Sequence, residues 1–537
     1  MKKLAFIAWL RTAFARTPLP LLGVLLALAA LPSPAAAGDD DDWPMFGQNL
    51  QNTANAKDGV KDVSRLKVKW TFTTGGDVSA RAAVVDKVAY FPDWGGNLWA
   101  VDTKRGTKVW GRKFTEYGLS ATNQSRNTPA VVDGVLYIGM QEGAWLLAID
   151  AKNGKLLWKT QLEVADPLAI ITTSPVVHGD RLYTGVASLQ EGAAANPAFP
   201  CCAGRGSVVA VDVKGANRGQ ILWKTYTVPL GYSGGGVWGS NFVVDPERGS
   251  IYASTGNNYA HPTDPAYLAC VAGGGTASAC QSPNNQVDAV LALNMKTGAI
   301  KWASRQTNWQ QPFVADGSDD WNVACLVGFL PGQGNCPTNA GPDYDFASAP
   351  NLITYRDSHG RKKSILGAGQ KSGIYYALDP DNGAVVWRTQ VGPGSALGGM
   401  EWGSASDGKR IYVSIANLYG IPTAVGGAGS WSALDPATGA ILWQVGDPNG
   451  AISVGPMTVA GDEVYVSSMA GSPTAPTMLA LSAATGQTLW SYASGASVNA
   501  GATVVDGVVF WGSGYTHLGI PGFTGNNKFY AFSKHGD

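Results

Sequence analysis

The sequence predicts an all-β fold, an eight-bladed β-propeller. Three observations indicate it: a repeat ending in Trp that recurs along the chain, a composition rich in Gly and Trp, and complementary half-copies of the repeat at the two ends. Of the 537 residues, 69 are Gly, 30 are Pro and 19 are Trp, while only 15% are charged. Such a composition is typical of many short strands joined by tight turns.

Each copy of the repeat reads Ala-x-Asp-x-x-x-Gly-x-x-x-Trp, as at Ala100, Asp102, Gly106 and Trp110. β-forming residues flank the turn, and the Gly suits a tight turn that requires a positive φ. Another pair of short strands precedes each copy, so one repeat supplies the four strands of a propeller blade. Six further copies, with some variation at the Asp and in the spacing, end at Trp158, Trp223, Trp302, Trp387, Trp443 and Trp490.

The two ends of the chain each hold half of an eighth copy. Residues 529–533 match its first half and lack the Trp, and residues 66–70 match its second half and end in Trp70. Seven whole copies and a split one predict eight blades, the last closed by strands from both ends of the chain. Such closure removes a free sheet edge. An open β-solenoid would not need complementary half-copies.

Residues 1–37 have the three parts of a secretory signal peptide. Four basic residues accompany an apolar stretch at 18–31, and the Ala residues at 35–37 offer a cleavage site. The apolar stretch contains Pro and is short for a membrane anchor. We therefore expect a periplasmic protein with a single domain at 38–537 and no membrane anchor after processing.

The charge of the predicted mature chain excludes two classes of partner. Removing residues 1–37 leaves 35 basic and 39 acidic residues, a net charge of −4. This balance gives no attraction to nucleic acid or to an anionic membrane. We expect no nucleic-acid partner.

An even number of Cys in an exported chain indicates disulfides. Cys270 with Cys280, and Cys325 with Cys336, would close short loops. Cys201 and Cys202 are then left to pair with each other or to stay free. The sequence has no Cys-x-x-Cys-His motif, so we expect no covalently attached haem.

The repeats resemble the tryptophan-docking motifs of the alcohol dehydrogenases that depend on pyrroloquinoline quinone (PQQ). Residues 42–49 are similar to the opening segment of that family, and the resemblance extends to residue 537. It is strongest with the polyvinyl alcohol dehydrogenases, through residues 200–206, 320–325 and 510–515. The resemblance implies oxidation of an alcohol, in particular a secondary alcohol or polyvinyl alcohol, with electrons passed to an external c-type cytochrome.

The resemblance also implies which residues bind PQQ. In the family a vicinal disulfide covers one face of the quinone, which implies a bond between Cys201 and Cys202. The Trp that stacks on the other face is matched by Trp238, which follows three Gly residues. The remaining matches are residues that hold the quinone's carboxylates or lie beside its carbonyl oxygens: Thr172, Arg205 and Lys371.

A metal site is implied by the same resemblance, and hard cations take oxygen ligands. The matched ligands are Glu191, Asn257, Asp343 and Asp345. Asp345 is an extra carboxylate of the kind found in lanthanide-using relatives, so the metal is Ca²⁺ or a lanthanide. The metal would act as a Lewis acid on the quinone carbonyl.

Two carboxylates compete for the role of the catalytic base. Asp343 lies in an Asp-Tyr-Asp segment that resembles the base motif of the family, with Lys371 following 28 residues later. Asp320, in an Asp-Trp-Asn segment, is the alternative. We predict that Asp343 removes the hydroxyl proton while hydride passes to the quinone.

Two other functions remain open at the level of sequence. One is a non-catalytic scaffold, because outer-membrane assembly factors share these repeats. The other is a PQQ dehydrogenase for sugars or small alcohols. A scaffold has no need for Cys201, Cys202, Asn257, Asp343 and Lys371 together, which favours an enzyme.

Overall fold

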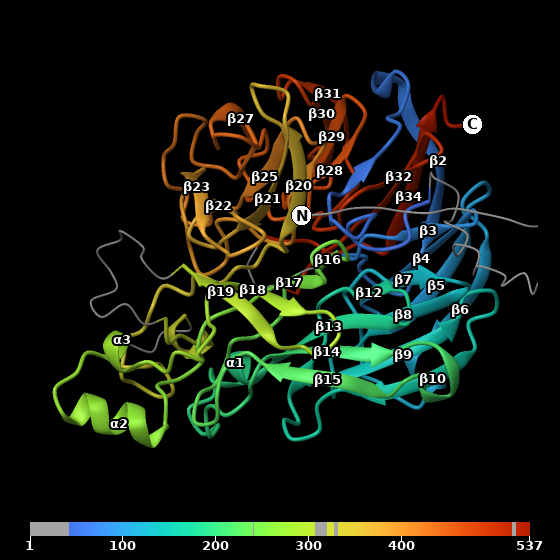
Figure 1. Cartoon of the computed structure of the whole chain (residues 1–537). Coiled ribbons are helices and arrows are strands. Elements are labelled where there is room, and N and C mark those ends of the chain that lie inside the picture. The colour runs from blue at the N-terminus through green and yellow to red at the C-terminus, as the bar shows by residue number, and fades with distance from the viewer. Residues whose placement is uncertain (1–41, 240, 307–318, 327–330, 518–521) are drawn as a thin grey trace, which may run out of the picture. The chain divides into compact units, whose positions relative to one another are not determined.

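The computed structural model describes residues 42–239, 241–306, 319–326, 331–517 and 522–537. The predicted signal peptide, residues 1–37, lies outside the described residues. Eight separate sheets, each built on four antiparallel strands, make up the unit Asp39–Asp537 (Figure 1). The prediction of an eight-bladed β-propeller is confirmed.

In each blade the strands follow one another from the centre of the ring outward, and the innermost strands of most neighbouring blades contact one another. Blades 1 to 4 consist of β3 (Ala83–Val85), β4 (Val88–Asp93), β5 (Asn97–Asp102) and β6 (Lys108–Lys113); β7 (Ala130–Val132), β8 (Val135–Gly139), β9 (Trp145–Asp150) and β10 (Leu156–Gln161); β12 (Val176–His178), β13 (Arg181–Ser188), β14 (Ser207–Asp212) and β15 (Ile221–Tyr226), with β11 (Ala169–Ile170) beside β13; and β16 (Val243–Asp245), β17 (Ser250–Ser254), β18 (Ala289–Asn294) and β19 (Ile300–Arg305).

The second half of the ring repeats this order. Blades 5 to 8 consist of β20 (Asn351–Arg356), β21 (Lys362–Gly369), β22 (Ile374–Leu378) and β23 (Val385–Gln390); β24 (Ala405–Ser406), β25 (Ile411–Ile415), β26 (Ser430–Leu434) and β27 (Ile441–Gly446); β28 (Thr458–Ala460), β29 (Glu463–Ser467), β30 (Met478–Ser482) and β31 (Thr488–Tyr492), with β1 (Asn55–Ala56) beside β28; and β32 (Thr503–Val505), β33 (Val508–Gly512), β34 (Lys528–Lys534) and β2 (Leu66–Thr73).

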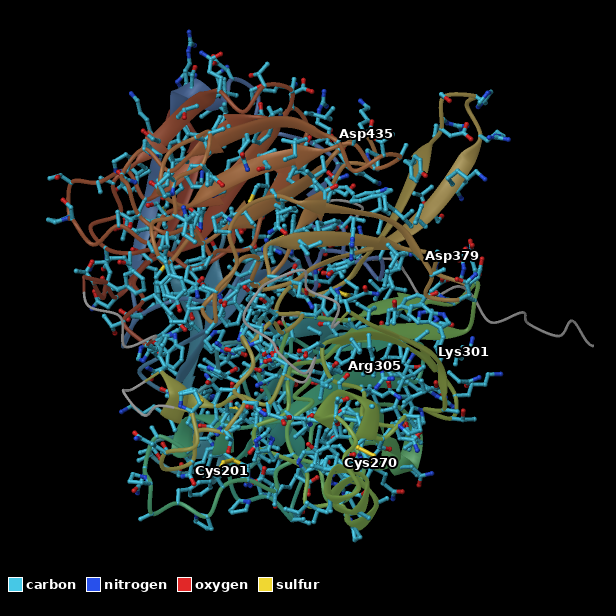
Figure 2. The ribbon with its side chains drawn as sticks, turned by 90° about the vertical axis from the view of Figure 1, so that its left-hand side faces the viewer. Cys201, Cys270, Lys301, Arg305, Asp379 and Asp435 are labelled. Atoms are coloured by element: carbon cyan, nitrogen blue, oxygen red, sulfur yellow. A yellow bond between two sulfur atoms is a disulfide. The ribbon has the colours of Figure 1, made fainter. Side chains whose placement is uncertain are left out.

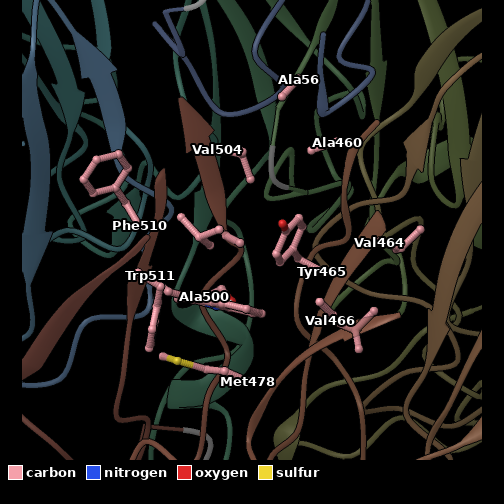
Figure 3. Packing of buried hydrophobic residues seen from close by; sticks show 14 of the residues in the cluster. Ala56, Ala460, Val464, Tyr465, Val466, Met478, Ala500, Val504, Phe510 and Trp511 are labelled. Carbon is pink, nitrogen blue, oxygen red and sulfur yellow. The ribbon is translucent and has the colours of Figure 1, made fainter. Parts of the chain in front are cut away.

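The last blade is closed by strands from both ends of the chain, as predicted. β2 pairs with β34 in antiparallel fashion, with Trp70 opposite Ala531. Side chains of this blade and of blade 7 form one buried cluster, which includes Tyr465, Phe510 and Trp511 (Figure 3). The core therefore continues across the point where the ring closes.

The Trp and the Gly of the repeat meet between neighbouring blades. Trp110 donates a hydrogen bond from Nε1 to the carbonyl of Ala151, at 2.8 Å. Gly154 has φ +72°, and a Cβ there would lie 2.8 Å from the Trp110 ring. The same pairing of a Trp with the Gly of the next blade recurs at Trp70 and Gly106, Trp158 and Gly219, Trp223 and Gly298, Trp302 and Gly383, Trp387 and Gly439, and Trp443 and Gly486.

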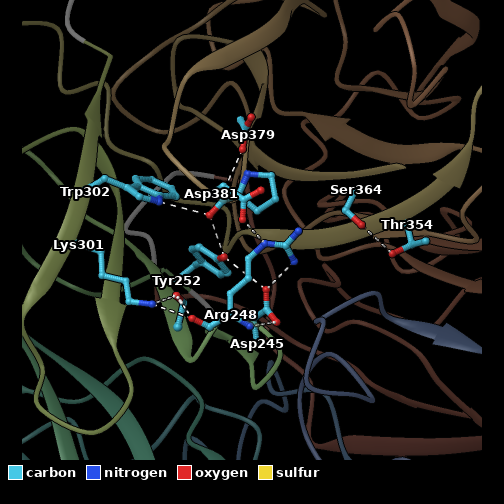
Figure 4. A network of polar contacts seen from close by, with 11 residues as sticks. Asp245, Arg248, Tyr252, Lys301, Trp302, Thr354, Ser364, Asp379 and Asp381 are labelled. Atoms are coloured by element: carbon cyan, nitrogen blue, oxygen red, sulfur yellow. Dashed lines mark hydrogen bonds and ion pairs between the residues drawn. The ribbon is translucent and has the colours of Figure 1, made fainter. Parts of the chain in front are cut away.

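Because successive strands of a blade run in opposite directions, its connections alternate between two faces. One face, the turn face, holds the short turns between first and second and between third and fourth strands. There Arg248 pairs with Asp245, at 3.0 Å, and with Asp381 of the next blade, at 2.7 Å (Figure 4). The other face, the loop face, holds the longer connections between second and third strands and between blades.

The described helices are short and lie in connections. They are η1 (Val63–Arg65), η2 (Phe114–Tyr117), α1 (Gln190–Ala193), η3 (Gly215–Asn217), α2 (Pro265–Ala272), α3 (Ala277–Cys280) and η4 (Val323–Cys325), and α2 and α3 lie outside the ring of sheets (Figure 1). Among the described residues no helix is long and apolar enough to cross a membrane.

Three disulfides are present, and they follow the local pairing expected from the sequence. Cys270 is bonded to Cys280, and Cys325 to Cys336. Cys201 and Cys202, whose state the residues alone left open, are bonded to each other. Cys201 and Cys270 lie at the same end of the molecule in Figure 2, in long connections of the loop face.

Candidate active site

Connections of blades 3, 4 and 5 converge on the loop face around one buried lysine. Lys371, just after β21, places Nζ 2.9 Å from Asp343 Oδ2 and 3.4 Å from Asp345 Oδ2. The same Nζ lies 5.1 Å from the centroid of the Trp238 ring. Both Asp side chains are buried. The structure therefore brings together four residues that the sequence predicted for one site.

Backbone hydrogen bonds join three segments that are far apart in the sequence. The N–H of Gly234 donates to Gly204 O at 2.8 Å, and that of Gly235 donates to Asn257 O at 2.7 Å. A Cβ on Gly234 would lie 2.2 Å from Asn257 O, so this close approach requires glycine. The loop of the vicinal disulfide, the triglycine before Trp238 and the segment of Asn257 thus form one unit.

Asp345 fixes the predicted quinone-stacking Trp and the predicted metal ligand relative to each other. Its Oδ2 accepts a hydrogen bond from Trp238 Nε1, and its Oδ1 accepts one from the N–H of Asn257, both at 2.7 Å. Both oxygens of Asp345 therefore have protein donors, which makes it a positioning residue here. Its predicted role as a metal ligand stays a prediction.

Several buried oxygens in the site accept no hydrogen bond, among them one of Asn257 and one of Asp343. The amide of Asn257 donates from Nδ2 to the carbonyls of Asn258 and Trp321, at 2.9 and 2.8 Å, which leaves its Oδ1 without a donor. Oδ1 of Asp343 is likewise buried and unpartnered. Buried polar atoms nearly always have a partner, so these oxygens indicate a ligand.

The electrostatics of the site also favour a bound cation. Burial raises the pKa of Asp343 well above its usual value, although Lys371 acts in the opposite direction. Burial and the charge of Asp345 raise the pKa of Glu191, half-buried in α1, to about 8. Burial lowers the pKa of Lys371, but Asp343 and Asp345 outweigh it, so Lys371 stays charged. One lysine thus faces several buried carboxylates.

The predicted ligand set fits a hard cation in chemistry, because it offers carboxylate and amide oxygens. Among the described residues, no three His, Cys, Asp or Glu side chains are arranged to hold a metal by themselves. The amide oxygen of Asn257 would then be a further ligand of the predicted set. The unpartnered oxygens of Asn257 and Asp343 are the atoms of this set that a bound cation would pair with.

Asp319 is a site residue that the sequence reasoning did not assign. It accepts hydrogen bonds from the N–H groups of Asp343 and Tyr344, at 2.9 and 2.7 Å. Asp343 has φ +61°, a conformation that few residues other than Gly adopt. Asp319 therefore holds the backbone that aims Asp343. Nothing in the sequence links the two residues, which are 24 positions apart.

Asp320, the alternative base, has different surroundings. Its Oδ2 lies 2.7 Å from Nδ1 of His261, and its backbone forms a bridge with Asn258. The structure thus places Asp320 against His261 and Asp343 against Lys371. A second carboxylate missed by the sequence reasoning is Asp288, just before β18, whose oxygens are buried and unpartnered.

The two residues predicted to hold the quinone carboxylates differ in their contacts. Thr172 donates from Oγ1 to the carbonyl of Trp238, at 3.2 Å, so it lies against the predicted stacking residue. The guanidinium of Arg205 lies 3.8 Å from the centroid of the Tyr226 ring and donates to Val228 O at 3.3 Å. Arg205 is thus engaged within its own blade, and its predicted role is untested.

Arg126 is a further cation that the sequence reasoning missed. It lines one cavity with Thr172 and Trp402, and its guanidinium lies 4.3 Å from the centroid of the Trp402 ring. Trp402 makes an edge-to-face contact with Trp238, with the ring centroids 5.5 Å apart. Trp402 therefore contacts both Arg126 and the predicted stacking residue, Trp238. The only sequence signal was an Arg in the connection between blades 1 and 2.

The loop of the vicinal disulfide is fastened at its base. Gln190 accepts hydrogen bonds at Oε1 from the N–H groups of Ala203 and Gly204, at 2.8 and 3.1 Å, and donates to Asp166 at 2.9 Å. Asn322 Nδ2 lies 3.9 Å from Cys201 Sγ. The disulfide is thus held beside the Asp320 segment.

Comparisons with known proteins agree with this geometry. A family profile described as "Outer membrane protein assembly factor BamB", of the PQQ repeat type, matches residues 56–304, 370–511 and 427–535. The chain belongs to the PQQ repeat family.

Within this PQQ repeat family, curated relatives are dehydrogenases. A polyvinylalcohol dehydrogenase of Pseudomonas sp is 29% identical over 523 residues, 88% of this chain and 73% of the relative. Another, of Sphingopyxis sp. (strain 113P3), is 31% identical over 444 residues, 78% of this chain but only 60% of the relative. These matches confirm the predicted resemblance to PQQ-dependent alcohol dehydrogenases and support that enzyme class.

A solved structure agrees on the fold. The quinohemoprotein alcohol dehydrogenase from Comamonas testosteroni superposes with a TM-score of 0.65 at 19% identity, over 93% of this chain and 81% of the other. At this identity the likeness concerns the propeller alone. The proposed roles of individual residues in this PQQ repeat protein rest on its own geometry.

Proposed function

We propose that this protein is a periplasmic quinoprotein dehydrogenase that oxidises secondary hydroxyl groups to ketones, with polyvinyl alcohol as its substrate. The proposed cofactors are PQQ and Ca²⁺ or a lanthanide, and the electrons pass to a separate c-type cytochrome. One observation carries the proposal. Lys371, Asp343 and Trp238 meet at one buried point, beside two oxygens that lack a hydrogen-bond donor.

Each residue of the site has a role in this proposal. Asp343 accepts the hydroxyl proton of the substrate, and Lys371 supplies positive charge beside it at 2.9 Å. PQQ, when bound, supplies the acceptor for the hydride. The groups proposed to hold PQQ are Cys201, Cys202, Thr172, Trp238, Arg205 and the additional Arg126. The groups proposed to hold the metal are Glu191, Asn257, Asp343 and Asp345.

The description of the family profile also raises the possibility of a non-catalytic scaffold. A scaffold gains nothing from the buried carboxylates around Lys371. Burying such groups without full pairing is costly, and that cost is typical of active sites. The cluster therefore supports the enzyme over the scaffold.

The test is a reconstitution assay. The purified protein would receive PQQ with Ca²⁺ or La³⁺ and a dye acceptor, and then polyvinyl alcohol, pentane-2,4-diol, propan-2-ol, ethanol or glucose. We expect turnover with the polymer and the secondary alcohols, and none when the metal is chelated. Turnover with glucose alone would replace the proposed substrate class. An absence of turnover with every substrate and both metals would support the scaffold.

A further inference from the structure

The loop face carries a second hollow, away from Lys371, between blades 7 and 8. This neutral groove has a volume of about 430 Å³. Its lining comes from the connection between β27 and β28, the loop after β29 and the loop before β34. Its apolar side chains are Ile452, Met469, Ala475 and Phe523.

The lining of the neutral groove contains no ionisable side chain. Asn449 and Ser472 supply polar groups, and glycines expose backbone between them. Two other hollows differ in both charge and position. Both are lined by charged side chains of either sign and reach turns of the turn face: Lys57, Asp58, Lys61, Asp506 and Lys534 line one, and Arg356, Lys362, Asp407, Lys409 and Asp435 line the other.

The neutral groove connects to the site through packed side chains. Met469 belongs to a buried cluster with Tyr515, and Ile452, Phe523 and Trp402 pack against that cluster. Trp402 in turn contacts Trp238 edge to face, with the ring centroids 5.5 Å apart. The groove and the site therefore lie on one face of the propeller and are linked by these packed side chains.

We propose that the neutral groove binds a distal segment of an uncharged polyol chain while another hydroxyl of the same chain lies at Asp343. This inference rests on the proposed function and adds a second binding site for the polymer. A carbon chain with alternating methylene and hydroxyl-bearing carbons has no charge to pair, so ionisable residues would only add desolvation cost. Methylenes suit Ile452 and Phe523, and hydroxyls suit Asn449 and Ser472.

The experiment compares two variants that change the groove with a matched control. Ile452→Ser removes an aliphatic side chain, and Ala475→Glu places a charge in the groove on a half-buried turn residue. Ile441→Ser makes the same chemical change on the exposed outer strand β27. Thermal unfolding would confirm that all three variants fold. None of these residues belongs to the site around Lys371.

Binding is measured first without turnover, by native electrophoresis in gels that contain polyvinyl alcohol. We expect the wild type to be retarded, the two groove variants to lose most of the retardation, and Ile441→Ser to keep it. In the dye assay the groove variants should raise KM for the polymer about five- to tenfold and leave KM for pentane-2,4-diol unchanged.

The two readouts separate the failure of this inference from that of the proposed function. Unchanged retardation in both groove variants overturns the inference, even if the enzyme oxidises alcohols. The inference is also overturned if the groove variants bind the polymer normally and lose turnover with a cytochrome acceptor but not with the dye. That result would assign the groove to the acceptor. If the groove variants lose retardation but the wild-type protein shows no turnover, polymer binding at the groove is supported and the proposed function is overturned.

Discussion

Asp343 and Asp320 are both buried carboxylates of the site, but their nearest charged groups differ. Asp343 contacts Lys371 at 2.9 Å and keeps one oxygen without a partner. Asp320 contacts the imidazole of His261 at 2.7 Å. The permanent positive charge of Lys371 favours the ionised form of Asp343, and a general base must be ionised to accept the proton. The two residues therefore differ in the group beside them, and Asp343 as the base stays a prediction.

Asp343→Asn should lower turnover by about 10²–10⁴-fold, because the amide keeps the shape but cannot accept the proton. Asp320→Asn should stay within a few-fold of the wild type. Both variants would be measured with saturating PQQ and metal on pentane-2,4-diol, since binding of the cofactor would weaken if Asp343 is also a ligand. An inactive Asp320→Asn beside an active Asp343→Asn would place the base in the Asp320 segment.

Among single residues, the sequence reveals those that belong to a motif. It does not reveal those whose role depends on contacts with segments distant in the sequence. Lys371 and Asp343 were found through the segments that contain them. Asp319 could not be assigned because its role is to hold a backbone 24 residues away. Arg126 was missed because its contact with Trp402 joins connections from distant blades. Such contacts depend on how loops pack, which periodicity does not encode.

The contact between a Trp and the Gly of the next blade recurs seven times, and it sets the spacing of the blades. The importance of the Trp could be predicted because it recurs in the sequence. The structure shows that it contacts the Gly of the next blade. Gly154 has φ +72°, and a Cβ there would be 2.8 Å from the Trp110 ring. Gly134 has nearly the same conformation, φ +75°, but nothing lies within 4 Å of an added Cβ.

These two glycines allow the packing to be measured apart from the backbone strain. Gly134→Ala should lower the free energy of unfolding by about 1 kcal/mol, the cost of a left-handed Ala. Gly154→Ala should lower it by about 2–4 kcal/mol, because the Trp110 ring must also move. Denaturant unfolding of both variants gives the difference. Equal losses would show that the Trp accommodates a methyl group and does not fix the blades.

At the scale of the whole molecule, the ring arrangement was predictable because the repeat is local and its two halves are complementary. Trp70 and the strand at 528–534 are separated by almost the entire chain, yet each carries an incomplete motif that the other completes. The loop face was not predictable in the same way. Its hollows, including the neutral groove, arise where unrelated connections meet.

The buried carboxylates of the site should make the stability of the metal-free protein depend on pH. Burial raises the pKa of Glu191 to about 8 and that of Asp319 to about 7. The folded protein then binds more protons than the unfolded chain above the ordinary carboxylate range, so the free energy of unfolding falls as pH rises towards 8. Surface carboxylates such as Asp62 and Asp357 have lowered pKa values and titrate below this window.

A cation reverses this trend, because it binds the ionised carboxylates and displaces their protons. We expect Tm of the metal-free protein to drop by a few degrees between pH 5 and pH 8. A change of about 1 kcal/mol in the free energy of unfolding shifts Tm by roughly this amount. Added PQQ with Ca²⁺ or La³⁺ should raise Tm more at pH 8 than at pH 5. Glu191→Gln, which cannot ionise, should flatten the drop and reduce the effect of the metal. A metal effect that is equal at both pH values would show that the cation does not bind at these carboxylates.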